Sequence, residues 1–153
     1  VKNRGHEAMP FYVGGHPGLN AKGGVAHLVL PEEENPEIWL LQDGSVTGHR
    51  PFGPLKELLI SKDTLKEYKT FILTGFKTND YILKTEDAIY SISTDAPTIG
   101  LWSKPHAGEY VCFEPWWGMA VQKDDDRDFK DKEFVNITNN SMKFGYSITF
   151  ERQ

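Results

Sequence analysis

The sequence predicts an all-β protein, a mostly antiparallel β-sandwich with little helix. Three apolar runs, at 71–73, 81–83 and 88–92, follow one another about ten residues apart, with turn-forming residues between them. Short strands at this spacing are typical of sandwiches and barrels. No repeat or linker interrupts the pattern, so we expect residues 1–153 to form a single domain.

The elements of the first half are strands bounded by turn signals. Strands are expected at 11–13, 25–30, 38–41 and 55–60. Pro31 should close the second of these, because proline cannot donate to a ladder. The turn at 42–45 is typical of a hairpin, and 48–54 is expected to be irregular. The one expected helical turn is 61–68, with a serine or aspartate as its cap.

The second half continues with seven expected strands. They are expected at 71–73, 81–83, 88–92, 98–102, 110–114, 135–138 and 144–150. Within the strand at 110–114, side chains alternate between faces. Val111 and Phe113 should therefore lie on one face, and Cys112 and Glu114 on the other. The proline that follows is expected to end this strand.

Glu114 is the first candidate functional residue, because Trp116 and Trp117 follow it after one proline. An apolar environment can raise the pKa of a carboxylate, and tryptophan can present a flat apolar face to a ligand. The plainer interpretation is a glutamate that pairs with a surface lysine, beside two tryptophans that fill the core. Perturbed acids occur both in functional sites and in structural pairs, so both interpretations stay open.

The second candidate is His16, in the stretch Gly14-Gly15-His16-Pro17. The two glycines permit unusual backbone dihedrals, and the proline restricts the histidine before it. Histidine is the side chain best suited to exchange protons near neutrality. On residue type alone, a structural turn histidine is the commoner outcome.

Together these stretches resemble the aldose 1-epimerase (galactose mutarotase) family. The motifs that carry the resemblance are Gly-Gly-His-Pro at 14–17, Trp-Ser-Lys-Pro at 102–105 and Cys-x-Glu-Pro-Trp-x-Gly at 112–118. The chain looks most like the branch with these motifs, and several motifs in the right order are more specific than any one. The resemblance implies a galactose mutarotase-like supersandwich. Because family members are longer, it implies that this chain is an incomplete, C-terminal half.

The resemblance also implies a reaction, the interconversion of the α and β anomers of an aldose by acid–base ring opening. Glu114 is then the base and His16 the acid. Asn20, Trp102 and Trp116 are the implied substrate-binding residues, with core packing as the alternative for the tryptophans. Glu114 and His16 should face one cavity, with a carboxylate oxygen and a ring nitrogen about 5–8 Å apart.

Three positions depart from the family pattern. Lys69 stands where an aspartate that holds sugar hydroxyls is expected, Val121 stands in place of an aspartate, and Leu19 in place of a phenylalanine. The alternative function is therefore a non-catalytic carbohydrate-binding β-sandwich that has kept the pocket and lost activity.

The composition argues against several classes of binding partner. The net charge is −5 with scattered lysines, which argues against nucleic acid and against anionic membranes. We expect a monosaccharide, either a hexose or a hexose phosphate, and either a missing N-terminal half or self-association. One cysteine, Cys112, fits a cytoplasmic protein. The five histidines lack paired ligand spacing and no phosphate or dinucleotide loop is present, so neither a metal nor a cofactor is expected.

Overall fold

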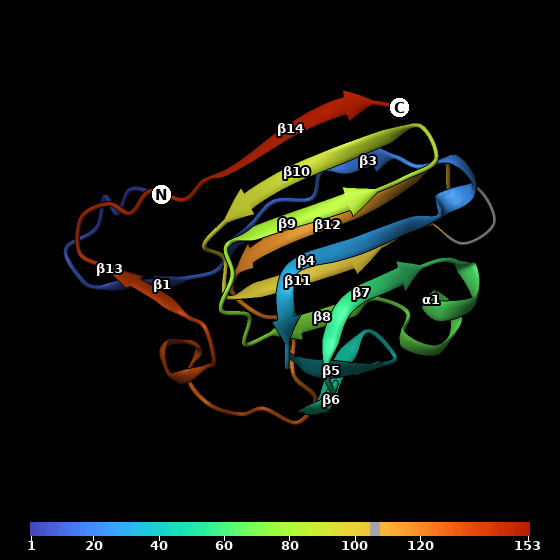
Figure 1. Ribbon diagram of the computed structural model, residues 1–153. Coiled ribbons are helices and arrows are strands. Elements are labelled where there is room, and N and C mark those ends of the chain that lie inside the picture. The colour runs from blue at the N-terminus through green and yellow to red at the C-terminus, as the bar shows by residue number, and fades with distance from the viewer. Residues whose placement is uncertain (105–107) are drawn as a thin grey trace.

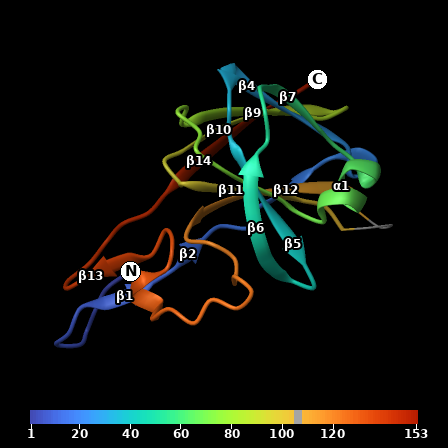
Figure 2. The ribbon, with the colours of Figure 1, turned by 90° about the horizontal axis from the view of Figure 1, so that it is seen from below.

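Two β-sheets pack face to face in the computed structural model, which describes residues 1–104 and 108–153 (Figure 1, Figure 2). One sheet has five strands, in the order β14 (Tyr146–Arg152), β10 (Ala88–Thr94), β9 (Asp80–Lys84), β4 (Ala26–Glu34) and β7 (Leu55–Ile60). The other has seven, in the order β2 (Val13–Gly14), β12 (Tyr110–Trp117), β11 (Thr98–Trp102), β8 (Phe71–Thr74), β5 (Glu37–Gln42) and β6 (Ser45–Pro51), with β3 (Gly18–Asn20) also paired with β12. The strands of both sheets pair antiparallel, which confirms the predicted all-β sandwich.

A two-stranded ribbon and short helical segments lie outside the two sheets. The ribbon, β1 (Met9–Phe11) with β13 (Asn136–Thr138), extends from the end of the sandwich near the N-terminus (Figure 1). The helical segments are η1 (Lys22–Gly24), α1 (Lys62–Tyr68) and η2 (Phe129–Asp131). In the described residues, no helix is long and apolar enough to cross a membrane.

The hydrophobic core fills the space between the sheets, and it fixes which side of β12 faces outward. Val111 and Phe113 are fully buried in this core together with Leu28 of β4, as the alternation predicts. Cys112 and Glu114 consequently lie on the outer face of the seven-stranded sheet, where they line surface hollows. The candidate carboxylate is thus held by a strand whose other face is packed in the core.

Two local predictions are confirmed by backbone geometry. Helix α1 begins after Ser61, whose hydroxyl accepts a hydrogen bond from the Thr64 N–H while the Thr64 hydroxyl accepts one from the Ser61 N–H. This reciprocal capping box satisfies donors that the first helical turn leaves free. The hairpin between β5 and β6 turns at Asp43 and Gly44, with φ of 51° and 80°. Positive φ at both positions matches the twist of the flanking strands.

Two sequence predictions, the end of the strand at 25–30 and the irregular segment 48–54, are wrong. Proline is tolerated in a strand where no partner strand needs its N–H. Strand β4 continues through Pro31, since its pairing with β7 is interrupted between Val29 and Glu34 and no ladder donor is required there. Strand β6 covers most of the segment 48–54 that the sequence predicts as irregular, and it ends at Pro51. It is an edge strand, and an edge accepts a proline whose missing donor faces away from the sheet.

Strand β12 also runs past its predicted end, through Pro115 to Trp117. The Pro115 carbonyl accepts a hydrogen bond from the Gly15 N–H at 2.9 Å, on the side of β2 and β3. In an antiparallel ladder the N–H and C=O of one residue point to the same side. The missing N–H of Pro115 therefore points to the gap between β2 and β3, and the ladder with β11 stays intact.

The turn between β8 and β9 depends on Glu34, at the end of β4. This side chain is 8% exposed, and its two carboxylate oxygens accept hydrogen bonds from the backbone N–H groups of Lys77 and Thr78 at 2.6 and 2.8 Å. Both hydrogen bonds are partly buried, and an ionised acceptor makes them stronger than hydrogen bonds between neutral groups. Glu34 therefore connects the end of β4, in the five-stranded sheet, to the turn that joins the two sheets between β8 and β9.

We expect Glu34→Ala to lower the free energy of unfolding by about 1–3 kcal/mol, because two partly buried backbone N–H groups lose a charged acceptor. Urea denaturation measures this loss. Glu33→Ala is the matched control, since Glu33 is exposed on the same strand and such substitutions usually change stability by about 0.5 kcal/mol or less. Equal unfolding midpoints for the two variants would contradict this role for Glu34.

Candidate functional site

His16 is held over β12 by the two short strands that flank it. On one side β2 pairs Gly14 with Trp116, and on the other β3 pairs Gly18 with Cys112. The sequence prediction of one strand at 11–13 did not include β3, because a three-residue strand that contains glycine has no distinctive pattern. The loop between the two pairings is therefore short, and it places His16 against the outer face of β12.

The His16 ring contacts Glu114, with 3.3 Å between Nε2 and Oε1. The His16 side chain is 61% exposed and the Glu114 side chain is 5% exposed. The two residues thus face one place, as the sequence predicts, but the expected separation of about 5–8 Å is too long. The pairing of β2 and β3 with β12 on either side of His16 keeps the loop close to that strand, which allows the direct contact.

Gly14 and Gly15 serve close packing, which differs from the dihedral freedom that the sequence suggests. Neither has a positive φ. A Cβ on Gly14 would lie 2.8 Å from the Trp116 ring, and one on Gly15 would lie 2.6 Å from the Tyr146 ring. Glycine therefore allows the His16 loop to lie directly on these aromatic side chains. Gly100 serves β11 in the same way, since a Cβ there would lie 2.9 Å from Trp116.

Burial controls the protonation of the acidic groups beneath His16. It raises the pKa of Glu114 above the ordinary value of 4.5, although the charge of His16 and the Trp116 indole oppose this effect. Burial also raises the pKa of the Cys112 thiol to about 11, and the nearby Glu114 charge adds to the shift. Glu114 is thus a stronger proton acceptor than an exposed glutamate.

Two hollows open on either side of His16. The first, of about 410 Å³, brings together His16, Glu114 and Trp116. The second, of about 520 Å³, is lined by His16 together with Asn20, Trp102 and Cys112. All five predicted site residues therefore line hollows that share the His16 side chain. The Trp102 ring also meets the His16 ring edge to face, with centroids 5.9 Å apart.

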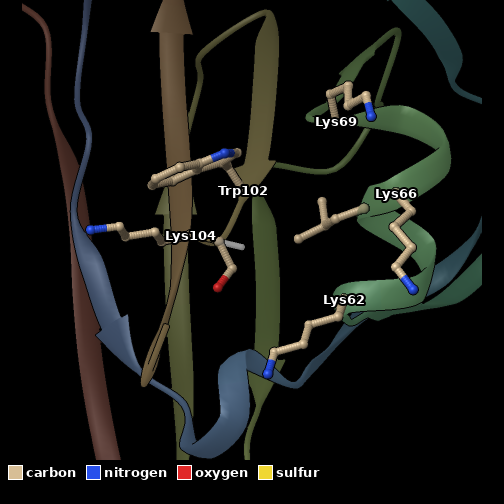
Figure 3. Close-up of a pocket in the computed structure, with 7 residues that line it drawn as sticks. Lys62, Lys66, Lys69, Trp102 and Lys104 are labelled. Carbon is tan, nitrogen blue, oxygen red and sulfur yellow. The ribbon is translucent and has the colours of Figure 1, made fainter. Parts of the chain in front are cut away.

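A third cavity, of about 290 Å³, lies between α1 and the end of β11 (Figure 3). Trp102 lines it as well, so it adjoins the second hollow. Its other lining residues are Leu65, Ser103 and four lysines, Lys62, Lys66, Lys69 and Lys104. Figure 3 shows that three of the lysines come from α1 or its end and that Lys104 comes from the side of Trp102. The spacing of Lys62, Lys66 and Lys69 places them on one face of the predicted helix. The sequence does not show that Lys104 lies at the same cavity.

Lys69, where the sequence resemblance predicts an aspartate, lies in this basic cavity. It ends α1 with φ of 64°, and its N–H donates to the Leu65 carbonyl at 2.8 Å. Lys69 therefore places an amine-bearing side chain in the same cavity as Trp102. Pro105, the last residue of the motif at 102–105, lies outside the described residues. His106 lies outside them as well.

Two solved structures of galactose mutarotase-like proteins share this fold. A galactose mutarotase related enzyme from Lactobacillus acidophilus superposes with a TM-score of 0.76 and 26% sequence identity, over 99% of this chain and 55% of that chain. A galactose mutarotase-like protein from Lactobacillus casei ATCC 334 gives a TM-score of 0.76 and 19% identity, over 97% and 54%. This chain therefore spans about half the length of these neighbours. No protein-family model matches it, and no curated protein matches it significantly.

The raised pKa of Glu114 leads to a prediction about stability. The folded state holds the Glu114 proton more tightly than the unfolded chain does, so the ionised carboxylate costs stability once the pH rises above the ordinary value of 4.5. Glu114→Gln removes this cost. We expect the variant to have a higher melting temperature than the parent at pH 7, with the difference vanishing in acid below 4.5.

Thermal unfolding followed by circular dichroism from pH 4 to pH 8 measures this difference. Glu33→Gln, at an exposed position of β4, is the control for a generic loss of negative charge. A melting temperature for Glu114→Gln that is lower than the parent's at pH 7 would mean that the His16 contact outweighs burial.

Proposed function

We propose that this protein interconverts the α and β anomers of an aldose, with Glu114 as general base and His16 as general acid. The observation that carries the proposal is the contact between a buried carboxylate and an accessible imidazole at a hollow edged by tryptophan. The galactose mutarotase-like fold is consistent with it. The further proposal that the chain acts as an isomerase rests on the chemistry of this pair.

The reaction requires two proton transfers, one at each of the two oxygens attached to the anomeric carbon. Glu114 takes the proton from the anomeric hydroxyl as the bond to the ring oxygen breaks, and His16 gives a proton to that oxygen. Rotation about the bond between the first two carbons and reversal of both transfers produce the other anomer. Both oxygens are attached to the anomeric carbon, so two groups in contact with each other can reach them from one side.

The protein's electrostatics suit these roles. Burial raises the pKa of Glu114, which makes the carboxylate a better proton acceptor near neutral pH. Histidine exchanges protons in the same range. Each positioned group of this kind typically contributes a factor of about 10² to 10⁴ to the rate.

The side chains around His16 and Glu114 bind the sugar in this proposal. Trp102 and Trp116 line the hollows on opposite sides of His16, and either can stack on the apolar face of a pyranose. Trp116 also packs partly against a second buried cluster that includes Ile72 and Met119. It therefore has a structural role as well, whereas Asn20 offers polar groups for sugar hydroxyls.

The basic cavity favours a hexose phosphate over a neutral hexose. In a chain of net charge −5, four lysines line the cavity beside Trp102, and no acidic residue is among its described lining residues. Lys66 already pairs with Asp63 at 3.1 Å, which leaves Lys62 and Lys69 on the same helix as the better candidates for a phosphate. Such a group would form charge-assisted hydrogen bonds with them.

We propose that an N-terminal half, equivalent to the rest of the neighbours' length, packs where β14 leaves the sandwich open. Phe150 of this edge strand is 62% exposed although it faces the same side as the buried Tyr90. A second copy of the chain could cover the same edge, and light scattering distinguishes a dimer from a monomer. The reduced Cys112 is consistent with the further proposal of a cytoplasmic location.

We expect Glu114→Gln to lower the rate of anomer interconversion by about two to four orders of magnitude with little change in sugar affinity, because the amide keeps the shape and loses the base. Polarimetry on freshly dissolved α-glucose, α-galactose and glucose 6-phosphate measures the rate. Glu109→Gln is the matched control, since Glu109 lines the neighbouring hollow but accepts a hydrogen bond from the Gly23 N–H.

Sugar binding without any acceleration by the parent chain would favour the carbohydrate-binding alternative. Equal rates for the parent and Glu114→Gln would remove Glu114 from the mechanism. A loss of rate in Glu109→Gln as large as in Glu114→Gln would show that the hollow tolerates no change of charge.

For a phosphorylated aldose, we expect Lys62→Met and Lys69→Met each to raise KM by roughly threefold to tenfold, because a phosphate contact is lost. Lys66→Met is the control on the same helix, because Lys66 pairs with Asp63. KM for the unphosphorylated sugar should not change in any of them. Equal KM values for all three variants and the parent would assign the phosphate elsewhere.

A further inference from the structure

His16, Cys112 and Glu114 bring together three groups that can bind a metal ion. One ring nitrogen of His16, the Cys112 sulfur and one carboxylate oxygen of Glu114 all lie within 4.8 Å of one another. Cys112 and Glu114 are two residues apart on the same face of β12, and the pairing of β3 with β12 brings His16 over them. Sequence spacing cannot predict this set, because its histidine is in a different segment.

The chemistry of the three groups fits one class of cation. Imidazole nitrogen, thiolate sulfur and carboxylate oxygen are the ligands of Zn²⁺, and three protein ligands with one open position form a common zinc site. Metal–ligand bonds of about 2.0–2.3 Å at tetrahedral angles place ligand atoms about 3.3–3.6 Å apart. The 3.3 Å between His16 Nε2 and Glu114 Oε1 is already in this range.

The geometry also provides access and rigidity. Cys112 and Glu114 are buried on a strand whose other face packs into the core, so their positions are fixed before a metal arrives. His16 is 61% exposed and can adjust its ring. Glu114 lines the first hollow and Cys112 the second, and His16 lines both, so an ion can enter from either side.

We propose that His16, Cys112 and Glu114 bind one Zn²⁺ ion, and that the bound ion blocks acid–base chemistry at this site. On binding, the Cys112 thiol gives its proton to bulk water and the thiolate coordinates the metal. The Glu114 oxygen and the His16 nitrogen then hold the metal and cannot exchange protons with a sugar. The inhibition rests on the proposed function, whereas the binding of zinc does not.

Binding is tested on the intact chain by calorimetric titration with ZnCl₂ and by the absorption of Co²⁺, which gives a thiolate charge-transfer band only when sulfur is a ligand. We expect one ion per chain, and at least about a tenfold weaker affinity in Cys112→Ser, because losing a ligand should cost no less than losing an outer-shell partner of a ligand. His49→Gln is the control, because His49 pairs with Glu37 at 3.2 Å at a place without a cysteine. Circular dichroism checks that both variants are folded.

Unchanged affinity in Cys112→Ser, or no thiolate band with Co²⁺, would overturn the site. Weaker binding in His49→Gln than in Cys112→Ser would place the ion at the other histidine.

The inhibition is tested by the ratio of anomer interconversion rates with and without ZnCl₂, measured for each variant with itself. We expect zinc to suppress the rate of the parent chain, a chelator to restore it, and Cys112→Ser to be resistant at the same zinc concentration. Equal suppression in parent and variant would overturn the inhibition. If the parent has no activity, the proposed function fails while the titrations still decide the zinc site.

Discussion

The burial of the Glu114 carboxylate beneath His16 is the interaction on which the site depends. It arises because β12 has two different faces, one packed into the core through Val111 and Phe113 and one open to the hollows. Strands β2 and β3 pair with the same edge of β12 and leave only a short loop to cross between them. Trp116 lines the hollow on one side of this contact, and Asn20 and Trp102 line the hollow on the other side.

The same burial links stability to chemistry. A carboxylate removed from water binds a proton more tightly, which costs stability at neutral pH and makes the group a better base. Close packing around the site also requires glycines. Gly14, Gly15 and Gly100 let the His16 loop and β11 lie against aromatic rings. Cys112 completes the set, because it shares the outer face with Glu114 and adds a thiol beside the proposed acid and base.

Much of the fold can be predicted from the sequence, because strand spacing, the Asp43-Gly44 turn and the Ser61 cap are local signals. The errors at prolines have a common cause. A proline such as Pro31 or Pro115 ends a strand only if a partner needs its N–H, and pairing is not visible in a single segment. The candidate site residues could be named from motifs, but the 3.3 Å contact between His16 and Glu114 and the position of Cys112 beside them depend on which strands pair.

The central claim, that buried Glu114 takes a proton from the sugar, is tested most directly by the pH dependence of kcat/KM for anomer interconversion. The base must be ionised, so the rate should fall in acid through the pKa of Glu114 in the free protein. Because burial raises that pKa, we predict that the acid limb lies above the ordinary carboxyl value of 4.5 and is absent from Glu114→Gln. An acid limb at or below 4.5, or one that persists in Glu114→Gln, would contradict the account.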